Sequence, residues 1–344
     1  MKNASCPLKP LLPEDGALLS IHTRLQQAFF TQKLRFRRHK EDPTPRKRDL
    51  TSPLPIHFQW EGGMAELQIS TDEPFSKPYC LSASGGADIF NLMPGIRWYW
   101  RLRAPDNTFS PIRTFTIEDK PPRIIRLDGI SNVRDMGGWR TSDGRRIRYG
   151  LLFRGAQFEA ASYLGDGITP EGRKSYFSEL GIRTELDLRK EGIKVLSQPG
   201  YRRIQVSASA YATWADDGVF SQEQMKIMKR NFSLFCKEDA YPIYIHCAGG
   251  GDRTGTLAFL LETAMGVSLE DALTDYEFSN LSTSGERSRF SKVFTAFLAR
   301  LETFAPGKSI QEQSIQYLKK CGVTAKMLAQ IQSIILEPCQ NQTL

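Results

Sequence analysis

Residues 242–255 read Pro242-Ile-Tyr-Ile-His-Cys-Ala-Gly-Gly-Gly-Asp-Arg-Thr-Gly255, an apolar run that ends in a cysteine and a glycine-rich loop. The run from Ile243 to His246 predicts a buried strand, and the apolar stripe between the loop and Gly266 predicts a helix. Successive amides of such a loop can point at one anion, and the positive end of the helix adds to their field. The stretch therefore predicts a strand, an anion-binding loop and a helix, as in an α/β layer fold.

Two side chains of this loop can carry phosphate chemistry. Arg253 follows Cys247 by six positions, and its guanidinium can hold two phosphate oxygens in a bidentate fork. Nearby cations and a helix N-terminus favour the thiolate form of a cysteine, so Cys247 is predicted to be a nucleophile beneath a bound phosphoryl group. Its in-line attack would give a phosphocysteine that water hydrolyses, with Thr254 stabilising the departing sulfur and no metal or cofactor required. His246 is expected to fix the loop by hydrogen bonds.

The loop is similar to the H-C-x-x-G-x-x-R-[ST]-G loop of the cysteine-based protein tyrosine phosphatase superfamily. Four further elements resemble those of the bacterial tyrosine and dual-specificity phosphatases: Asn132-Val-Arg-Asp-Met-Gly-Gly138, Leu152-Phe-Arg-Gly155, Asp187-Leu-Arg189 and Asp275-Tyr-Glu-Phe-Ser-Asn280. The resemblance implies a mostly parallel sheet flanked by helices, with the loop at the carboxyl end of a strand. It also implies a hydrolase that needs neither metal nor cofactor.

The resemblance further implies which residues contact the phosphate. They are the loop residues and three residues of the other matching elements: Ala248, Gly249, Gly250, Gly251, Asp252, Arg253, Asp187, Arg189 and Arg134. The chain departs from the family at Gly251, where a lysine is common. That lysine suits phosphoinositides and multiply phosphorylated substrates, so its absence counts against them, although Arg134, Arg154 or Arg189 could compensate.

Several functions are consistent with this loop. The residues favour a protein-tyrosine or dual-specificity phosphatase that acts on a phosphorylated protein or a small phosphomonoester. The alternatives are an inositol phosphate or phosphoinositide phosphatase of the same chemistry and a non-catalytic adaptor that binds phosphorylated partners. A sulfurtransferase also uses an anion-binding cysteine loop, but the ending Arg253-Thr-Gly255 fits phosphatases better.

The general acid that would protonate the leaving oxygen is left open between three places. Trp214-Ala-Asp-Asp-Gly218 lies about 30 residues before the cysteine and loosely resembles the W-P-D element of the superfamily, which favours Asp216 or Asp217. Asp252 is the second candidate, because the bacterial phosphatases carry an aspartate at that place in the loop. Asp187 is the third.

The chain from Pro121-Pro122 onward alternates strands with helices, and residues 121–344 are predicted to form the α/β phosphatase domain. Strands are predicted near Thr184 to Leu188 and Ile204 to Val206. A capping box, Ser221-x-x-Gln224, predicts a helix that ends near Cys236. Amphipathic stripes predict further helices over 290–301, 309–320 and 325–335.

Residues before this boundary show a period of two. Ile56, Phe58 and Trp60 alternate with polar residues, and so do the apolar residues of 65–69 and 96–102. This pattern predicts strands with one buried face, and it resembles a fibronectin type III or immunoglobulin-like all-β sandwich over residues 8–119. Trp98 to Trp100 are predicted to belong to its core. Such a domain could dock a protein or a glycan.

Composition excludes several classes of protein. The 344 residues carry a formal net charge of +8, but Lys33 to Arg48 alone hold eight Lys or Arg and two acids, which predicts a solvated basic loop over 33–48. No nucleic-acid-binding pattern is present, no C-x-x-C pair occurs, and no apolar run is long enough to span a membrane.

The start MKNASC lacks the apolar stretch of a signal peptide and predicts a cytoplasmic protein as written. Ala4-Ser5-Cys6 resembles a lipoprotein cleavage site, so a lost upstream leader would make the protein periplasmic or a surface lipoprotein.

Overall fold

The structure is a computed structural model of the 344-residue chain, and it describes residues 8–31, 49–161, 166–211, 217–283 and 287–338. The chain divides into two compact units. The first consists of residues 1–24 and 53–123, and the second of residues 25–52 and 124–344. Within the described ranges, every helix is too short or too polar to cross a lipid bilayer.

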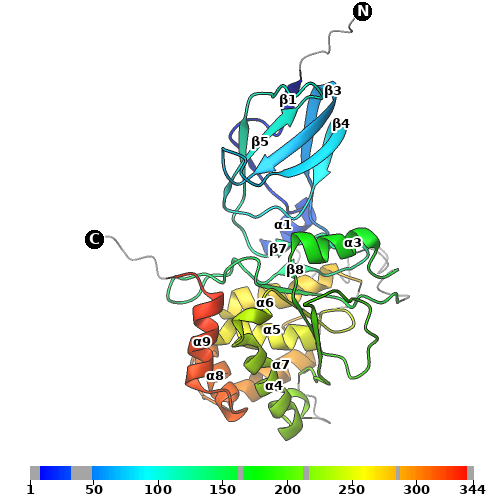
Figure 1. Ribbon diagram of the computed structural model, residues 1–344. Coiled ribbons are helices and arrows are strands. Elements are labelled where there is room, and N and C mark those ends of the chain that lie inside the picture. Colours follow the sequence, from blue (N-terminus) through cyan, green and yellow to red (C-terminus); the bar gives the residue numbers. More distant parts are fainter. Residues whose placement is uncertain (1–7, 32–48, 162–165, 212–216, 284–286, 339–344) are drawn as a thin grey trace, which may run out of the picture. The chain divides into compact units, whose positions relative to one another are not determined.

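The first unit is built from strands (Figure 1). They are β1 (Lys9–Leu12), β2 (Ala17–Leu19), β3 (Ile56–Ser70), β4 (Tyr79–Ile89), β5 (Arg97–Arg103) and β6 (Arg113–Ile117). Hydrogen bonds join them in the order β1-β3-β5-β6-β2, with β4 also on β3, and only the β2–β6 pair is parallel. The predicted strands and the burial of Trp100 are confirmed. An immunoglobulin-like sandwich of two sheets is not shown by this pairing, because all six strands belong to one hydrogen-bonded sheet.

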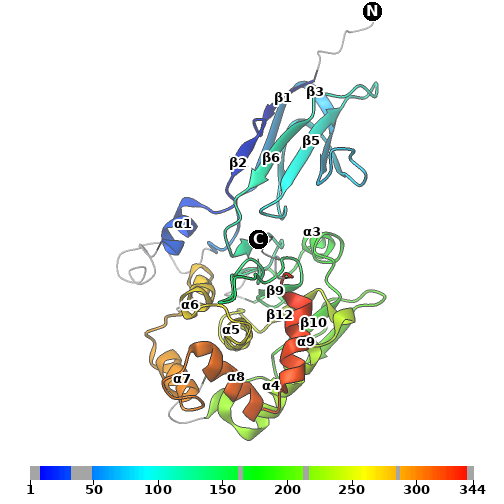
Figure 2. The same cartoon turned by 90° about the vertical axis from the view of Figure 1, so that its left-hand side faces the viewer.

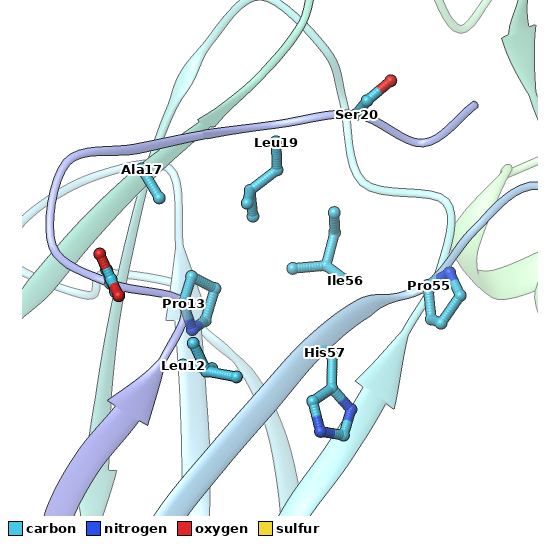
Figure 3. A pocket seen from close by; sticks show the side chains of 9 residues that line it. Leu12, Pro13, Ala17, Leu19, Ser20, Pro55, Ile56 and His57 are labelled. Atoms are coloured by element: carbon cyan, nitrogen blue, oxygen red, sulfur yellow. The ribbon is translucent and has the colours of Figure 1, made fainter. Parts of the chain in front are cut away.

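A pocket of about 400 Å³ lies in this unit, between the end of β1, strand β2 and the start of β3 (Figure 3). Six apolar residues line it: Leu12, Pro13, Ala17, Leu19, Pro55 and Ile56. The three polar residues of the lining are Glu14, Ser20 and His57. The residues predicted to carry chemistry belong to the second unit.

The second unit is an α/β fold. In chain order its elements, with the two that begin at the unit boundary, are α1 (Arg24–Phe30), β7 (Arg123–Ile124), β8 (Arg134–Asp135), β9 (Leu152–Gly155), α3 (Pro170–Lys174), β10 (Thr184–Asp187), β11 (Arg202–Gln205), α4 (Gln222–Phe235), β12 (Ile243–His246), α5 (Arg253–Ala264), α6 (Leu269–Phe278), α7 (Lys292–Glu302), α8 (Ile310–Lys320) and α9 (Ala325–Ile335). The sheet order is β11-β10-β12-β9-β8-β7, and β11, β10, β12 and β9 run parallel. The predicted α/β fold with a mostly parallel sheet is confirmed.

Alternate residues of the central strands enter two separate cores, one on each face of the sheet. On one face Leu152, Ile243 and Ile245 pack in the main core, to which α4, α5, α8 and α9 contribute. On the other face Phe153 and Tyr244 pack in a second core with the segment that follows α3. Figure 2 shows α3 and α4 on opposite sides of these strands. Because both faces are covered, β12 is held rigidly and fixes the start of the loop that follows it.

Helix α1 belongs with the second unit, which corrects the predicted domain division. Residues 25–52 lie inside the predicted range of the first domain, 8–119, but they group with residues 124–344. The reason is apolar packing: Phe29 is 2% exposed, and the Phe30 ring stacks on Phe278 with centroids 5.7 Å apart. The backbone also joins this unit, because the amide of Leu50 donates to the carbonyl of Leu281 at 2.8 Å.

Candidate active site

Cys247 follows β12 directly, and β12 lies between β10 and β9 in the parallel part of the sheet. The thiol residue is 2% exposed and packs in the main core. Helix α5 begins at Arg253, so the loop of residues 247–252 joins the carboxyl end of a central strand to the N-terminus of a buried helix. This is the place where open α/β sheets bind ligands.

The carbonyl groups of this loop are turned toward the surrounding protein. Three consecutive carbonyls each accept one hydrogen bond at 2.9 Å from outside the loop: Ala248 from the Gln157 amide, Gly249 from Asn132 Nδ2, and Gly250 from Arg154 Nη2. Because the N–H of a peptide group points opposite to its C=O, the amides that follow these carbonyls face the other way. Among the described residues, none accepts a hydrogen bond from the amides of 248–252. The loop therefore presents a set of unpaired donors, as an anion-binding nest does.

Gly250 is required by the path of the loop. Its φ is +70°, a value that side chains with a Cβ disfavour. A Cβ at this position would also lie 2.3 Å from the carbonyl oxygen of Gly155. The close approach to the end of β9 sets the curvature of the loop.

A buried ionic cluster supports the loop from below. Asp275 accepts from Arg134 Nε at 2.7 Å and also from Arg154, whose other amino group reaches the Gly250 carbonyl. Burial and the charge of Arg154 lower the pKa of Arg134 to about 10, so it stays charged at neutral pH. Asn132, which holds the Gly249 carbonyl, accepts in turn from Arg134 at 2.7 Å. Arg134 was predicted to contact substrate, but its side chain is fully buried and acts on the loop through Asn132.

A second cluster lies beside Cys247. His246 Nδ1 lies 3.1 Å from the Cys247 carbonyl oxygen and His246 Nε2 lies 3.0 Å from Glu185 Oε1, so each ring nitrogen is within hydrogen-bond distance of an oxygen atom. The expectation that His246 fixes the loop agrees with these contacts. Burial opposes ionisation of Asp187, but hydrogen bonds from Arg189 outweigh it and lower the Asp187 pKa to about 2.

Ligand atoms of Glu185, Asp187 and His246 lie within 4.8 Å of one another, a spacing that could hold a metal ion. Two guanidinium groups already pair with these carboxylates: Arg203 with Glu185 at 3.2 Å and Asp187 at 2.6 Å, and Arg189 with Asp187 at 2.8 Å. Because the charge of the acids is neutralised by arginine, this donor set does not fit a metal ion. Asp187 and Arg189, predicted to bind phosphate, are instead paired with each other and largely buried.

Arg253 and Thr254 occupy the first turn of α5. Arg253 is half-buried, and its guanidinium makes no hydrogen bond or ion pair with the part of the chain that the structure describes. Thr254 is fully buried, and its hydroxyl also has no hydrogen-bond partner within the described ranges. Both side chains therefore keep donors available at the loop, which is where the sequence predicted their roles.

Asp252 holds the N-cap position of α5, but its side chain makes no capping hydrogen bond. Its carboxylate instead accepts from Arg287 Nη2 at 2.6 Å and from Tyr211 Oη at 3.1 Å. Tyr211 Oη also lies 2.8 Å from Tyr276 Oη. Sequence reasoning missed Tyr211, Tyr276 and Arg287. Tyr276 lies within the motif Asp275 to Asn280, which could have indicated it, whereas no local pattern marks the other two.

The candidates for the general acid lie in different surroundings. Asp252 is at the loop itself. Asp217 is largely exposed and lies 3.8 Å from Arg300, while Asp216 lies outside the described residues. Asp187 has a pKa of about 2 and remains ionised at neutral pH, so it is not placed to donate a proton.

Comparison with known proteins shows what this chain is similar to. A family model described as the tyrosine phosphatase family matches residues 125–337, more than half of the chain. A protein of Cupriavidus necator named "Putative tyrosine-protein phosphatase" is 25% identical over 201 residues, which cover 52% of this chain and 69% of that protein. Among solved structures, the core catalytic domain of the PP-IP phosphatase SIW14 from S. cerevisiae in complex with citrate is 15% identical with a TM-score of 0.31, covering 48% of this chain and 93% of that one.

Proposed function

The chain belongs to the tyrosine phosphatase family, and we propose that it hydrolyses phosphomonoesters by way of a phosphocysteine formed on Cys247. The observation that carries this proposal is the loop of 247–252, in which consecutive carbonyls are bound to the surrounding protein while the amides of 248–252 find no acceptor among the residues that the structure describes. Such a ring of donors matches the equatorial oxygens of a phosphoryl group. Arg253, at the start of α5 and without an ion-pair partner in the described part of the chain, adds a bidentate contact and a positive charge.

The proposed reaction has two steps. The thiolate of Cys247 attacks phosphorus in line with the ester oxygen, the S–P bond forms, and the P–O ester bond breaks. The leaving oxygen takes a proton from a general acid. A water molecule then attacks phosphorus and gives a proton to the conjugate base of the general acid, the S–P bond breaks, and phosphate leaves with the thiolate and the acid restored. The unpaired hydroxyl of Thr254 is available to donate to the sulfur as it departs.

We infer that the substrate is a phosphorylated tyrosine, with phosphorylated serine or threonine as a second class. The family supports this choice. The general acid is Asp252 or an aspartate of 216–217. Variants that replace each of these aspartates by asparagine can be compared on a series of aryl phosphates. Loss of the general acid slows hydrolysis of esters with poor leaving groups such as phenol far more than of those with good ones such as nitrophenol, so the variant that shows this pattern identifies the acid.

The mechanism is tested with Cys247→Ser in the full chain. The wild type should hydrolyse para-nitrophenyl phosphate in the presence of a metal chelator, and Cys247→Ser should lose at least about 10³-fold in rate, because a serine hydroxyl in this site is not ionised. Phosphate affinity should be retained, since the amides and Arg253 are unchanged. Full activity of the variant would overturn the mechanism. A wild type that binds phosphopeptides without releasing phosphate would be an adaptor instead.

A further inference from the structure

An arginine from outside the loop is placed against its backbone. Arg287 lies in the segment between α6 and α7, and its side chain is only 12% exposed. Its guanidinium pairs with Asp252 at 2.6 Å. The opposite oxygen of that carboxylate accepts from Tyr211. Both oxygens of Asp252 are thus held away from the helix that it would otherwise cap.

Gly251 makes room for this guanidinium. A Cβ at position 251 would lie 2.7 Å from Arg287 Nε, closer than real Cβ atoms approach, and 3.0 Å from Arg287 Nη2, so the guanidinium would have to shift away from its present position. The φ of Gly251 lies outside the left-handed region, so the requirement for glycine is one of space and not of backbone conformation.

The backbone of Arg287 is fixed as well. Asn280, the last residue of the motif that begins at Asp275, donates from Nδ2 to the Arg287 carbonyl and accepts from the Arg287 amide. The same motif supplies Asp275 to the cluster below the loop. One segment at the end of α6 therefore positions both the support of the loop and the arginine at its edge.

The position of Asp252 makes this pairing consequential. Asp is a preferred N-cap residue because its carboxylate accepts from the first free amides of a helix. Here those amides adjoin the predicted phosphate site, so a capping carboxylate would compete with the phosphate for donors and repel its negative charge. The ion pair with Arg287 removes both effects.

We propose that Arg287 is a positioning residue that keeps Asp252 off the N-terminus of α5 and neutralises its charge, and that Gly251 is needed to admit it. The affinity of the loop for a phosphate dianion is then not reduced by the Asp252 carboxylate. The inference rests on the proposed function, because it assumes that the loop binds the substrate's phosphate.

Tungstate, a phosphate-like oxyanion, is the probe for a calorimetric titration of the full-length protein. Arg287→Ala should weaken tungstate binding by about tenfold or more, because a free carboxylate now faces the anion. Arg287→Lys should lose less. The double variant Arg287→Ala/Asp252→Asn should bind within about threefold of Asp252→Asn alone, since the harm done by losing Arg287 acts through the charge of Asp252. In kinetics with para-nitrophenyl phosphate, whose leaving group depends little on a general acid, KM should rise while kcat changes little, even if Asp252 is that acid.

A second variant and a control variant distinguish a specific loss of tungstate binding from a general loss of folding. Gly251→Ala leaves both charged groups in place but fills the space of the guanidinium, so it should weaken tungstate binding in the same way, and Asp252→Asn should rescue it. Arg289→Ala, two residues along the same segment and paired with Glu270 and Glu277, should leave tungstate affinity unchanged.

The outcomes separate the two proposals. If the double variant binds as weakly as Arg287→Ala, Arg287 acts by another route and the inference is overturned. If Gly251→Ala binds like the wild type, the inferred role of Gly251 is wrong. If the wild type binds no tungstate at all, the proposed function itself fails.

Discussion

Thr254 is the residue at which the two steps of the proposed reaction can be told apart. Its hydroxyl is fully buried, and no hydrogen-bond partner is found for it within the described ranges, an arrangement that costs stability unless a partner forms during function. Thr254→Ala should therefore slow breakdown of the phosphocysteine by about 10²-fold, the usual effect of losing one preorganised donor. Rapid-quench kinetics with para-nitrophenyl phosphate should give a burst of nitrophenol close to one per enzyme, followed by a slow steady rate.

Thr254→Ser keeps the hydroxyl and should restore most of the steady rate. Thr274→Ala, which removes a hydroxyl bonded to the Glu270 carbonyl on α6, should show no burst. Equal slowing of both steps by Thr254→Ala, without a burst, would contradict the role given to its hydroxyl.

Residues also show where sequence reasoning reaches its limit. Cys247, Arg253 and Thr254 could be predicted as site residues because the chemistry proposed for them depends on spacing within one short loop. Arg287 acts on that loop from 35 positions away, and nothing in its local sequence indicates the contact. Arg134 was predicted to contact the phosphate, and its sequence motif does not reveal that the side chain is fully buried and paired with Asp275.

At the scale of elements, ion pairs join Asp187 at the carboxyl end of β10 to Arg203 of β11 and to Arg189, and this makes stability depend on pH. The Asp187 pKa is lowered to about 2, against an unfolded value of about 3.9. Because the folded pKa is the lower one, the stabilisation is fully present above about pH 4 and is lost as the pH falls toward 2. Asp187→Asn leaves Arg189 and Arg203 without this charge and should cost about 3 kcal/mol at pH 7.

Urea unfolding from pH 7 down to pH 2 checks this prediction. The difference between the wild type and Asp187→Asn should shrink below pH 4. The matched control is Asp143→Asn, since the Asp143 pKa is also lowered to about 2, but its side chain is half exposed and its pair with Arg145 is worth little. A difference between the wild type and Asp187→Asn that is constant with pH would contradict the assignment.

Most elements of the second unit could be predicted, because their apolar periodicity and caps are local. The helix after Ser221 is an example, although only half of its capping box forms: Ser221 accepts from the Gln224 amide, while the Gln224 side chain bonds to Ser207 and Ser209. The stripe predicted from Phe290 begins later, since α7 starts at Lys292 and Phe290 is 69% exposed. The periodicity of apolar residues in the sequence does not show at which residue a helix begins to pack against the core.

At the scale of the whole molecule, the second unit includes residues 25–52, which come before strands β3 to β6 of the first unit in the sequence. Phe29 of α1 is 2% exposed and packs with Phe278 and Leu281. Phe29→Ala should lower the free energy of unfolding of this unit by about 3 kcal/mol and lower the temperature at which activity is lost. Thermal unfolding followed by activity measures this effect, with Leu18→Ala, an exposed residue of β2, as the control.

A fragment that begins at residue 121, as the sequence boundary suggests, should be less stable than the full chain for the same reason. Its loss includes the hydrogen bond from the Asn132 amide to Thr51 Oγ1 at 2.8 Å. Equal stability of the fragment and the full chain would contradict the grouping of residues 25–52 with this unit. Long-range packing of this kind has no local signature, which is why the domain division could not be predicted correctly.

The central claim is that the sulfur of Cys247 carries the phosphoryl group during turnover. It is tested most directly by quenching the reaction of the full-length protein with acid within milliseconds, digesting the protein and locating phosphate by mass spectrometry. The account predicts one phosphoryl group on the peptide that contains Cys247, with the amount increased in Thr254→Ala. A phosphoryl group on another residue, or none at any time during rapid turnover, would contradict it.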